Sequence, residues 1–205
     1  MLRLMAILRL CLVIALVLCA SCGERPKLER LPSEAVVLAF GDSLTYGTGA
    51  AEDESYPAQL ERLIGRRVVR AGVPGEVTAQ ALARLPGALD EHAPRLVLLC
   101  IGGNDFLRRA GNAQAEHNVR AMVKLAKSRG IGVLLIGAPE PGLLVSPPAF
   151  YAGIAQELGV PYEASVIGEV LRDAALKSDP IHPNARGYRV IAERLAAALK
   201  KSGAI

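Results

Sequence analysis

The 205-residue sequence contains no tryptophan, and tyrosine and phenylalanine together supply only 4% of its residues. Hydrophobic residues nevertheless make up 51%, so the core must be aliphatic, and this share excludes an intrinsically disordered chain. Tracts of lysine and arginine interleaved with aromatics are also missing, so we do not expect a nucleic-acid partner. The length suits a single domain, which we expect to be a monomer.

Cysteine is scarce, and its placement excludes a disulfide framework. Cys11, Cys19 and Cys22 fall within the first 22 residues, which leaves Cys100 alone in an apolar run, where it should be core. The sequence has no HExxH motif and no Cys/His cluster, so no metal is expected. A fragment at Gly47-x-Gly49 lacks the Gly-Lys-Ser/Thr or further glycine that nucleotide binding requires, so no cofactor is expected.

The N-terminus has the pattern of an export signal. In residues 1–21, two arginines precede an uncharged apolar segment, Leu10–Leu18, and small residues precede Cys22. That segment is shorter than the ~20 apolar residues of an ordinary spanning helix. The sequence around Cys22 resembles a bacterial lipobox, although Cys19 stands where leucine is usual. We therefore predict a signal peptide over residues 1–21, lipidation of Cys22, and a lipid anchor facing the periplasm.

Two alternatives remain for this segment: cleavage to a soluble periplasmic or secreted protein, and an uncleaved anchor. Residues 22–34 are polar with two prolines and are expected to form a tether before a single domain, residues 35–205. Removal of Arg3 and Arg9 with the signal peptide leaves 22 basic against 20 acidic residues, a formal charge of about +2.

From residue 35 onward, short apolar runs alternate with amphipathic stretches. Unbroken aliphatic runs of this kind are typical of strands buried on both faces of a parallel sheet. Helical stretches between strands predict a three-layer α/β/α sandwich with a mostly parallel sheet of about five strands. The expected strands are Val36–Phe40, Arg67–Ala71, Leu96–Ile101, Ile131–Ile136 and Val160–Tyr162; the expected helices are Tyr56–Ile64, Thr78–Leu89, a stretch around 119–126 that ends at Gly130, Pro148–Leu158 and 188–199, the last capped by Asn184.

A residue that could offer a polar group to a ligand lies in the loop after each of the first three strands. Ser43 comes after the first, Gly75 after the second and Asn104 after the third. In open α/β sheets, ligands bind at the carboxyl ends of the strands, so all three loops should open onto one site. They offer a hydroxyl, backbone N–H groups and a carboxamide.

A serine hydroxyl is a weak nucleophile without a base, and the sequence has only three histidines. His117 falls on the polar face of a helix and is expected to be a solvated side chain. His92 ends a helix, where a cation is favoured, and is expected to be structural. His182 lies in a proline-stiffened loop before the last helix, three residues after Asp179. We therefore expect Asp179 and His182 to act with Ser43.

The blocks Gly41-Asp42-Ser43-Leu44, Gly75, Gly102-Gly103-Asn104-Asp105 and Asp179-Pro180-Ile181-His182 resemble, in order, the four sequence blocks of the GDSL (SGNH) hydrolases. The resemblance covers nearly all of residues 35–200 and is greatest to the small bacterial thioesterase/lysophospholipase/arylesterase type. It implies a flavodoxin-like SGNH fold and a Ser-His-Asp triad that works without a cofactor.

The same resemblance implies a role for each matched residue. Ser43 would be the nucleophile, His182 its base, and Asp179 the carboxylate that orients the imidazole. The backbone N–H groups of Ser43 and Gly75 and the Asn104 side chain would form the oxyanion hole. Two further acids in these blocks, Asp42 and Asp105, are expected to fix loop geometry through hydrogen bonds to the backbone.

We therefore predict a serine esterase that hydrolyses small-molecule carboxylic esters, thioesters or lysophospholipids through an acyl-enzyme. The segment Pro139–Phe150 is apolar and is expected to line the pocket. One alternative is a carbohydrate O-deacetylase with the same triad and fold. Another, of a different class, is a non-catalytic envelope lipoprotein that binds a ligand, although simple binding needs no Ser43, Asp179 and His182 set.

Overall fold

The computed structural model describes residues 26–142 and 145–205; the predicted signal peptide and Cys22 lie outside this part. Within it, five strands form one parallel sheet in the order β2-β1-β3-β4-β5. This confirms the predicted α/β fold. The strands are β1 Val37–Gly41, β2 Val68–Gly72, β3 Leu96–Cys100, β4 Gly132–Ile136 and β5 Tyr162–Glu163.

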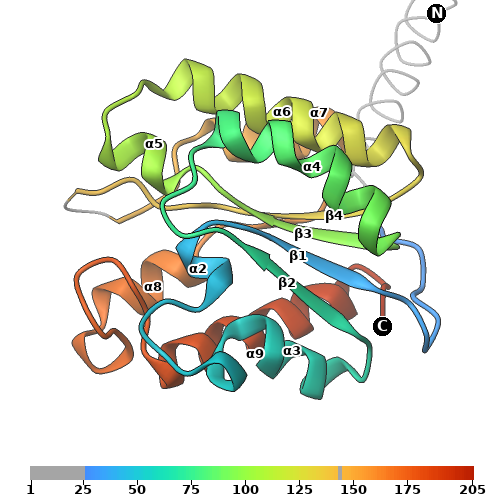
Figure 1. Ribbon diagram of the computed structural model, residues 1–205, viewed down its shortest axis with the longest axis horizontal. Helices are drawn as coiled ribbons and strands as arrows, with labels where there is room; N and C mark the ends of the chain where they lie inside the picture. Colours follow the sequence, from blue (N-terminus) through green and yellow to red (C-terminus); the bar gives the residue numbers. More distant parts are fainter. Residues whose placement is uncertain (1–25, 143–144) are drawn as a thin grey trace, which may run out of the picture.

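Helices cover both faces of the sheet (Figure 1). One face carries α4, α6 and α7, and the other carries α3, α8 and α9. Alternate residues of β1 point to opposite faces, as a strand requires: Val37 and Ala39 join one core cluster, Leu38 and Phe40 the other. The helices are α2 Ser43–Tyr46, α3 Tyr56–Ile64, α4 Thr78–His92, α5 Gly103–Leu107, α6 Asn112–Ser128, α7 Phe150–Leu158, α8 Val166–Arg172 and α9 Ala185–Lys201, with short 3-10 turns at Glu52–Glu54 and Ala174–Leu176.

Most predicted elements are present, with shifted ends. The fifth strand begins at Tyr162 rather than Val160, and α4 continues to His92. Three short helices, α2, α5 and α8, were not predicted. Both α2 and α5 follow strand ends, and with 4 and 5 residues they are too short to show a helical period. The side chain of Asn184 accepts a hydrogen bond from the Gly187 N–H at 3.0 Å, which confirms the predicted cap of α9.

The strand order determines where a ligand can bind. The chain runs from β1 outward to β2 and then returns past β1 to β3, so the order reverses between β1 and β3. Such a switch point opens a crevice at the carboxyl ends of the strands. The segments that follow β1 and β3, which carry Ser43 and Asn104, flank this crevice.

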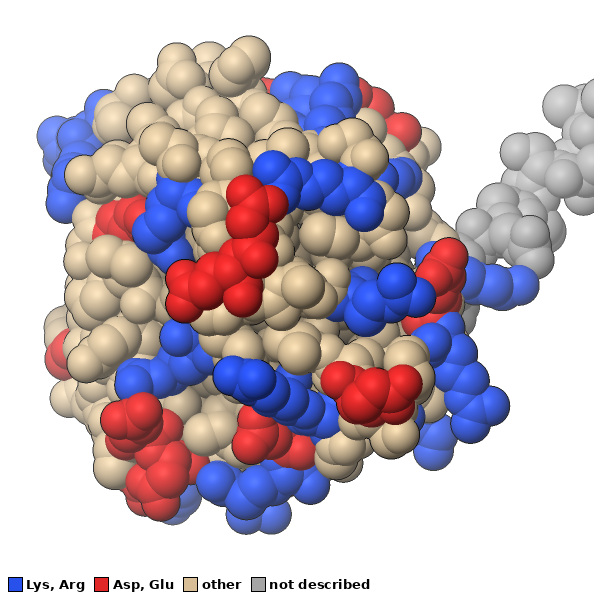
Figure 2. Space-filling model, turned by 45° about the vertical axis from the view of Figure 1, so that its right-hand side comes forward, with Lys and Arg blue, Asp and Glu red and all other residues tan. Residues whose placement is uncertain are grey.

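Acidic and basic side chains are interspersed on the face of the molecule turned forward in Figure 2. The start of the described chain is held against its end: the Leu28 N–H donates to the Ser202 carbonyl, and the Leu31 N–H donates to that of Ala204. Among residues 26–142 and 145–205, no helix is long and apolar enough to cross a membrane.

Candidate active site

Ser43 is the first residue of α2, at the carboxyl end of β1. The turn requires a glycine at position 41, because a Cβ there would lie 1.9 Å from the Cys100 carbonyl oxygen. Asp42 caps the helix, with its side chain accepting the Leu44 N–H at 3.0 Å. The tight turn and the capped helix together hold the Ser43 hydroxyl at the edge of the sheet.

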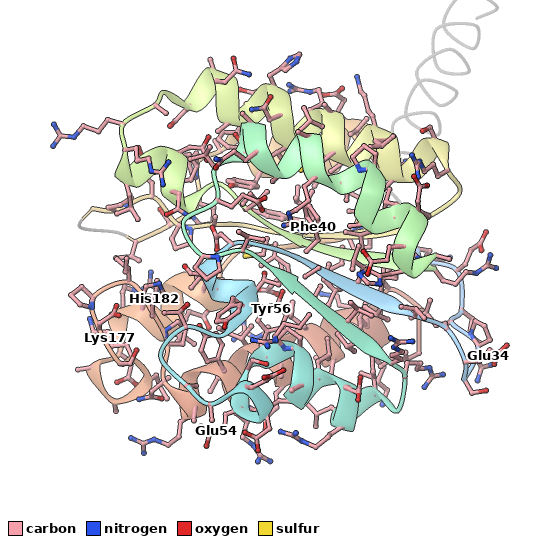
Figure 3. The ribbon with its side chains drawn as sticks, in the orientation of Figure 1. Glu34, Phe40, Glu54, Tyr56, Lys177 and His182 are labelled. Atoms are coloured by element: carbon pink, nitrogen blue, oxygen red, sulfur yellow. The ribbon has the colours of Figure 1, made fainter. Side chains whose placement is uncertain are left out.

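His182 comes from the loop before α9 and reaches Ser43 across 139 positions of sequence. Its Nε2 lies 3.0 Å from Ser43 Oγ, and its Nδ1 lies 2.8 Å from Asp179 Oδ2. Figure 3 shows His182 at the loop end of the molecule, beyond the strands. The structure thus brings together the three side chains that the sequence predicted as a triad.

The Asp179 carboxylate is held by its own loop. Its Oδ1 accepts the backbone N–H groups of Ile181 and His182, both at 2.9 Å. Burial raises the pKa of Asp179, but the hydrogen bonds from the His182 side chain and these N–H groups outweigh it, so the pKa lies below its ordinary value. Asp179 is therefore ionised at neutral pH and can orient the imidazole.

The three predicted oxyanion donors, Ser43, Gly75 and Asn104, line one cavity of about 490 Å³, which His182 also lines. Gly75 has φ +77°, a left-handed conformation that favours glycine. Asn104, in α5, donates through Nδ2 to the Glu76 carbonyl at 3.0 Å. The same nitrogen carries a second hydrogen, which leaves Asn104 a donor for a ligand.

The other two histidines lie elsewhere. His92 ends α4 with Nε2 3.7 Å from Glu91, and His117 is exposed on α6. Neither lines the cavity. Cys100 is buried, as predicted. Within residues 26–142 and 145–205, no cluster of three His, Cys, Asp or Glu side chains could hold a metal ion.

Buried acids support the loops of the site. Asp105 accepts the Thr78 N–H at 2.9 Å and the Thr78 hydroxyl at 2.6 Å. The predictions that Asp42 and Asp105 fix the loops are thus confirmed. Burial, together with repulsion from Glu76 and Asp105, raises the pKa of Asp42 to about 7. Sequence reasoning missed Thr78 and Glu76; the position of Glu76 directly after a predicted donor was the only signal for it.

The cavity walls are mainly apolar. Part of the predicted wall, 139–142 and Val145, lines it, whereas residues 143–144 lie outside the described chain. The other walls come from α2, α5, α8, the loop after β2 and the loop that carries His182. The apolar lining consists of Leu44, Pro74, Leu107, Pro139, Pro141, Val145, Leu171, Pro180 and Ile181.

Residues 39–190 match the model of the GDSL-like lipase/acylhydrolase family, a range that contains all four sequence blocks. The chain belongs to this family. It is 32% identical over 160 residues to the esterase TesA of Pseudomonas aeruginosa, covering 72% of this chain and 79% of that protein. It is 33% identical over 172 residues to thioesterase 1/protease 1/lysophospholipase L1 of Escherichia coli K12, and the match covers 80% of this chain and 83% of that protein.

A solved structure of TesA superposes with a TM-score of 0.73 and 28% identity, covering 82% of this chain and 99% of that one. This member of the GDSL-like lipase/acylhydrolase family is therefore a hydrolase with an α/β fold, and it cleaves ester bonds of small-molecule substrates.

Proposed function

We propose that the protein is a serine esterase in which Ser43, His182 and Asp179 form the catalytic triad. The observation that supports this most strongly is the pair of contacts made by one imidazole, 3.0 Å to Ser43 Oγ and 2.8 Å to Asp179 Oδ2, at an apolar cavity. Both lie within the hydrogen-bond reach expected of a nucleophile, a base and its orienting group.

In the proposed reaction, Nε2 of His182 takes the hydroxyl proton while Ser43 Oγ attacks the ester carbonyl carbon. The resulting oxyanion receives hydrogen bonds from the N–H groups of Ser43 and Gly75 and from the Asn104 side chain. The imidazolium then gives its proton to the leaving oxygen or sulfur, and the bond to the leaving group breaks. Water attacks the acyl-enzyme by the same route and releases the acid.

Each element of this site supplies part of the rate enhancement. An oxyanion donor is typically worth about 3–4 kcal/mol of transition-state stabilisation, because it points at charge that develops only during the reaction. The ionised Asp179 stabilises the imidazolium and holds the tautomer in which Nε2 accepts.

The apolar cavity favours substrates whose acyl part is hydrophobic. Leu107 and Leu171 lie on its wall, and its size, about 490 Å³, falls within the usual range for small-molecule sites. We propose that the acyl chain of a carboxylic ester, thioester or lysophospholipid occupies it. The names of the relatives in Pseudomonas aeruginosa and Escherichia coli support this group of substrates.

We further propose that the enzyme works at the bacterial cell envelope. In this proposal residues 1–21 are a signal peptide, Cys22 is lipidated and anchors the chain on the periplasmic side, and residues 22–34 link it to one hydrolase domain, 35–205. The Leu28 and Leu31 N–H groups donate to carbonyls of the C-terminal segment, so the domain end of this link is attached there.

A substrate panel tests the function. Purified protein is assayed with p-nitrophenyl esters of graded chain length, acyl-CoA, a lysophospholipid and an acetylated sugar, with Ser43→Ala as the matched control. We expect the wild-type protein to hydrolyse acyl substrates and the Ser43→Ala protein to be inactive on them. Turnover confined to the acetylated sugar would assign a deacetylase instead, and the absence of any turnover would indicate a binding protein.

A further inference from the structure

The loop after β2 carries one partner of an ion pair next to the proposed oxyanion hole: the Glu76 carboxylate is buried, and the Arg84 side chain is partly exposed. Glu76, only 6% exposed, follows Gly75 in the chain. Its carboxylate receives two hydrogen bonds from Arg84 of α4, from Nε at 2.8 Å and from Nη2 at 2.6 Å. Two-pronged pairs of this kind fix direction as well as distance.

Arg84 is itself fixed to the sheet. Its guanidinium lies over the ring of Phe40, 4.0 Å from the centroid, on the face that α4 covers. Phe40 is labelled in Figure 3, between the strands and that helix layer. Arg84 Nη2 also lies 3.2 Å from the Ala71 carbonyl and 3.4 Å from that of Gly41, at the ends of β2 and β1. The arginine therefore links the loop to the two strands that precede the site.

Glu76 in turn sets the positions of two of the three donors. Its backbone N–H donates to the Val73 carbonyl at 3.1 Å, which closes the turn that contains Gly75. Its carbonyl accepts Asn104 Nδ2 at 3.0 Å, which fixes the direction of that carboxamide. A shift of Glu76 would therefore move the Gly75 N–H and the Asn104 side chain together.

We propose that Glu76 and Arg84 are positioning residues that hold the Gly75 and Asn104 donors in register with Ser43. This inference rests on the proposed function. The negative charge of Glu76 opposes the negative charge of an oxyanion, so neutralising it would raise the rate if the field of the carboxylate dominated. A fall in rate on neutralisation therefore reports the position of the loop.

The first test is Glu76→Gln, which keeps the shape of the side chain but weakens the two-pronged bond. With a p-nitrophenyl ester, kcat should fall about 10- to 100-fold and KM should change less than about 3-fold, because loss of one whole donor costs about 10²–10³ in kcat. Arg84→Lys keeps the charge without the planar fork and should show a smaller loss of the same kind. Glu157→Gln is the control. It weakens an ion pair at the surface, between Glu157 of α7 and Arg120 of α6, whose atoms lie 2.9 Å apart. Its kcat should stay within about 2-fold of the wild type.

The second test combines Glu76→Gln with Asn104→Ala. If Glu76 acts through the donors, its substitution should cost clearly less kcat in the Asn104→Ala background than in the wild type. The proposal would be overturned if Glu76→Gln lowered kcat by the same factor in both backgrounds. It would also be overturned if kcat were unchanged in both Glu76→Gln and Arg84→Lys. Should Glu76→Gln fail to fold, the same cycle with Arg84→Lys decides. If only the positioning role of Glu76 and Arg84 is wrong, the Ser43→Ala protein is still inactive. An active Ser43→Ala protein would refute the proposed function itself.

Discussion

Asp42 should make the stability of the protein depend on pH in an unusual direction. The side chain is 2% exposed and caps α2 just before Ser43. Burial is the main cause that raises its pKa from 3.8 to about 7, and the charges of Glu76 and Asp105 add to it. The unfolded chain therefore loses the Asp42 proton at a lower pH than the folded protein does.

The consequence for the free energy of unfolding follows from proton linkage. Below about pH 4 both states are protonated at Asp42, and the contribution of this group to stability is complete. As the pH rises from about 4 to about 7, ionisation favours the unfolded chain, and the contribution is lost. A pKa difference of about 3 units corresponds to about 4 kcal/mol, at 1.36 kcal/mol per unit.

The assay compares Asp42→Asn with the wild type by urea unfolding at several pH values between 4 and 8. Asparagine keeps an oxygen that can accept the Leu44 N–H but has no charge to lose. Relative to the wild type, the variant should gain stability as the pH rises to about 7 and then level off, by an amount on the order of 4 kcal/mol. If the difference in free energy of unfolding between Asp42→Asn and the wild type stayed constant or fell as the pH rose, the Asp42 carboxyl would not have the raised pKa given above.

Three further predictions concern the triad, the turn before Ser43 and the N-terminus. Asp179→Asn should lower kcat strongly, by up to about 10⁴-fold as in serine proteases, and should change KM less. An unchanged kcat would argue against the triad. Gly41→Ala should unfold the protein or lower its melting temperature sharply, because the new methyl would meet the Cys100 carbonyl. In the control, Gly87→Ala in α4, the new methyl meets nothing within 4 Å, and the protein should be stabilised by about 0.5–1 kcal/mol. Equal melting temperatures of the two variants would contradict this prediction. Cys22→Ala should move the protein from the membrane to the soluble fraction, and mass spectrometry that found an unmodified Cys22 would exclude the anchor.

The sheet could be predicted because its central strands, β1, β3 and β4, are short, aliphatic and almost fully buried. β3 and β1 are buried at every position, and runs such as Leu96–Cys100 show no polar alternation that would suggest another structure. The site could be predicted because the topology of parallel sheets places the residues after neighbouring strands together. Ser43 and Asn104 follow neighbouring strands, and the sequence blocks identified His182 as their distant partner.

The supporting roles of Asp42 and Asp105 were predicted, but the side chains that pair across the site could not be, because their contacts follow no regular spacing. The carboxylate of Asp105 reaches Thr78 across 27 positions, and Glu76 pairs with Arg84 from a loop to a helix face. Such pairs depend on how the α4 axis lies over the sheet, which sequence periodicity does not determine. The short helix α2 depends likewise on the single cap by Asp42, and four residues carry no periodic signal.

The central claim is that Ser43 is the nucleophile. The most direct measurement is peptide mass spectrometry of the wild-type protein after reaction with a fluorophosphonate, which forms a stable bond to an activated serine. We predict a single adduct on Ser43, which forms as activity is lost and is missing in both Ser43→Ala and His182→Ala. An adduct on another residue, or an active protein without any adduct, would contradict it.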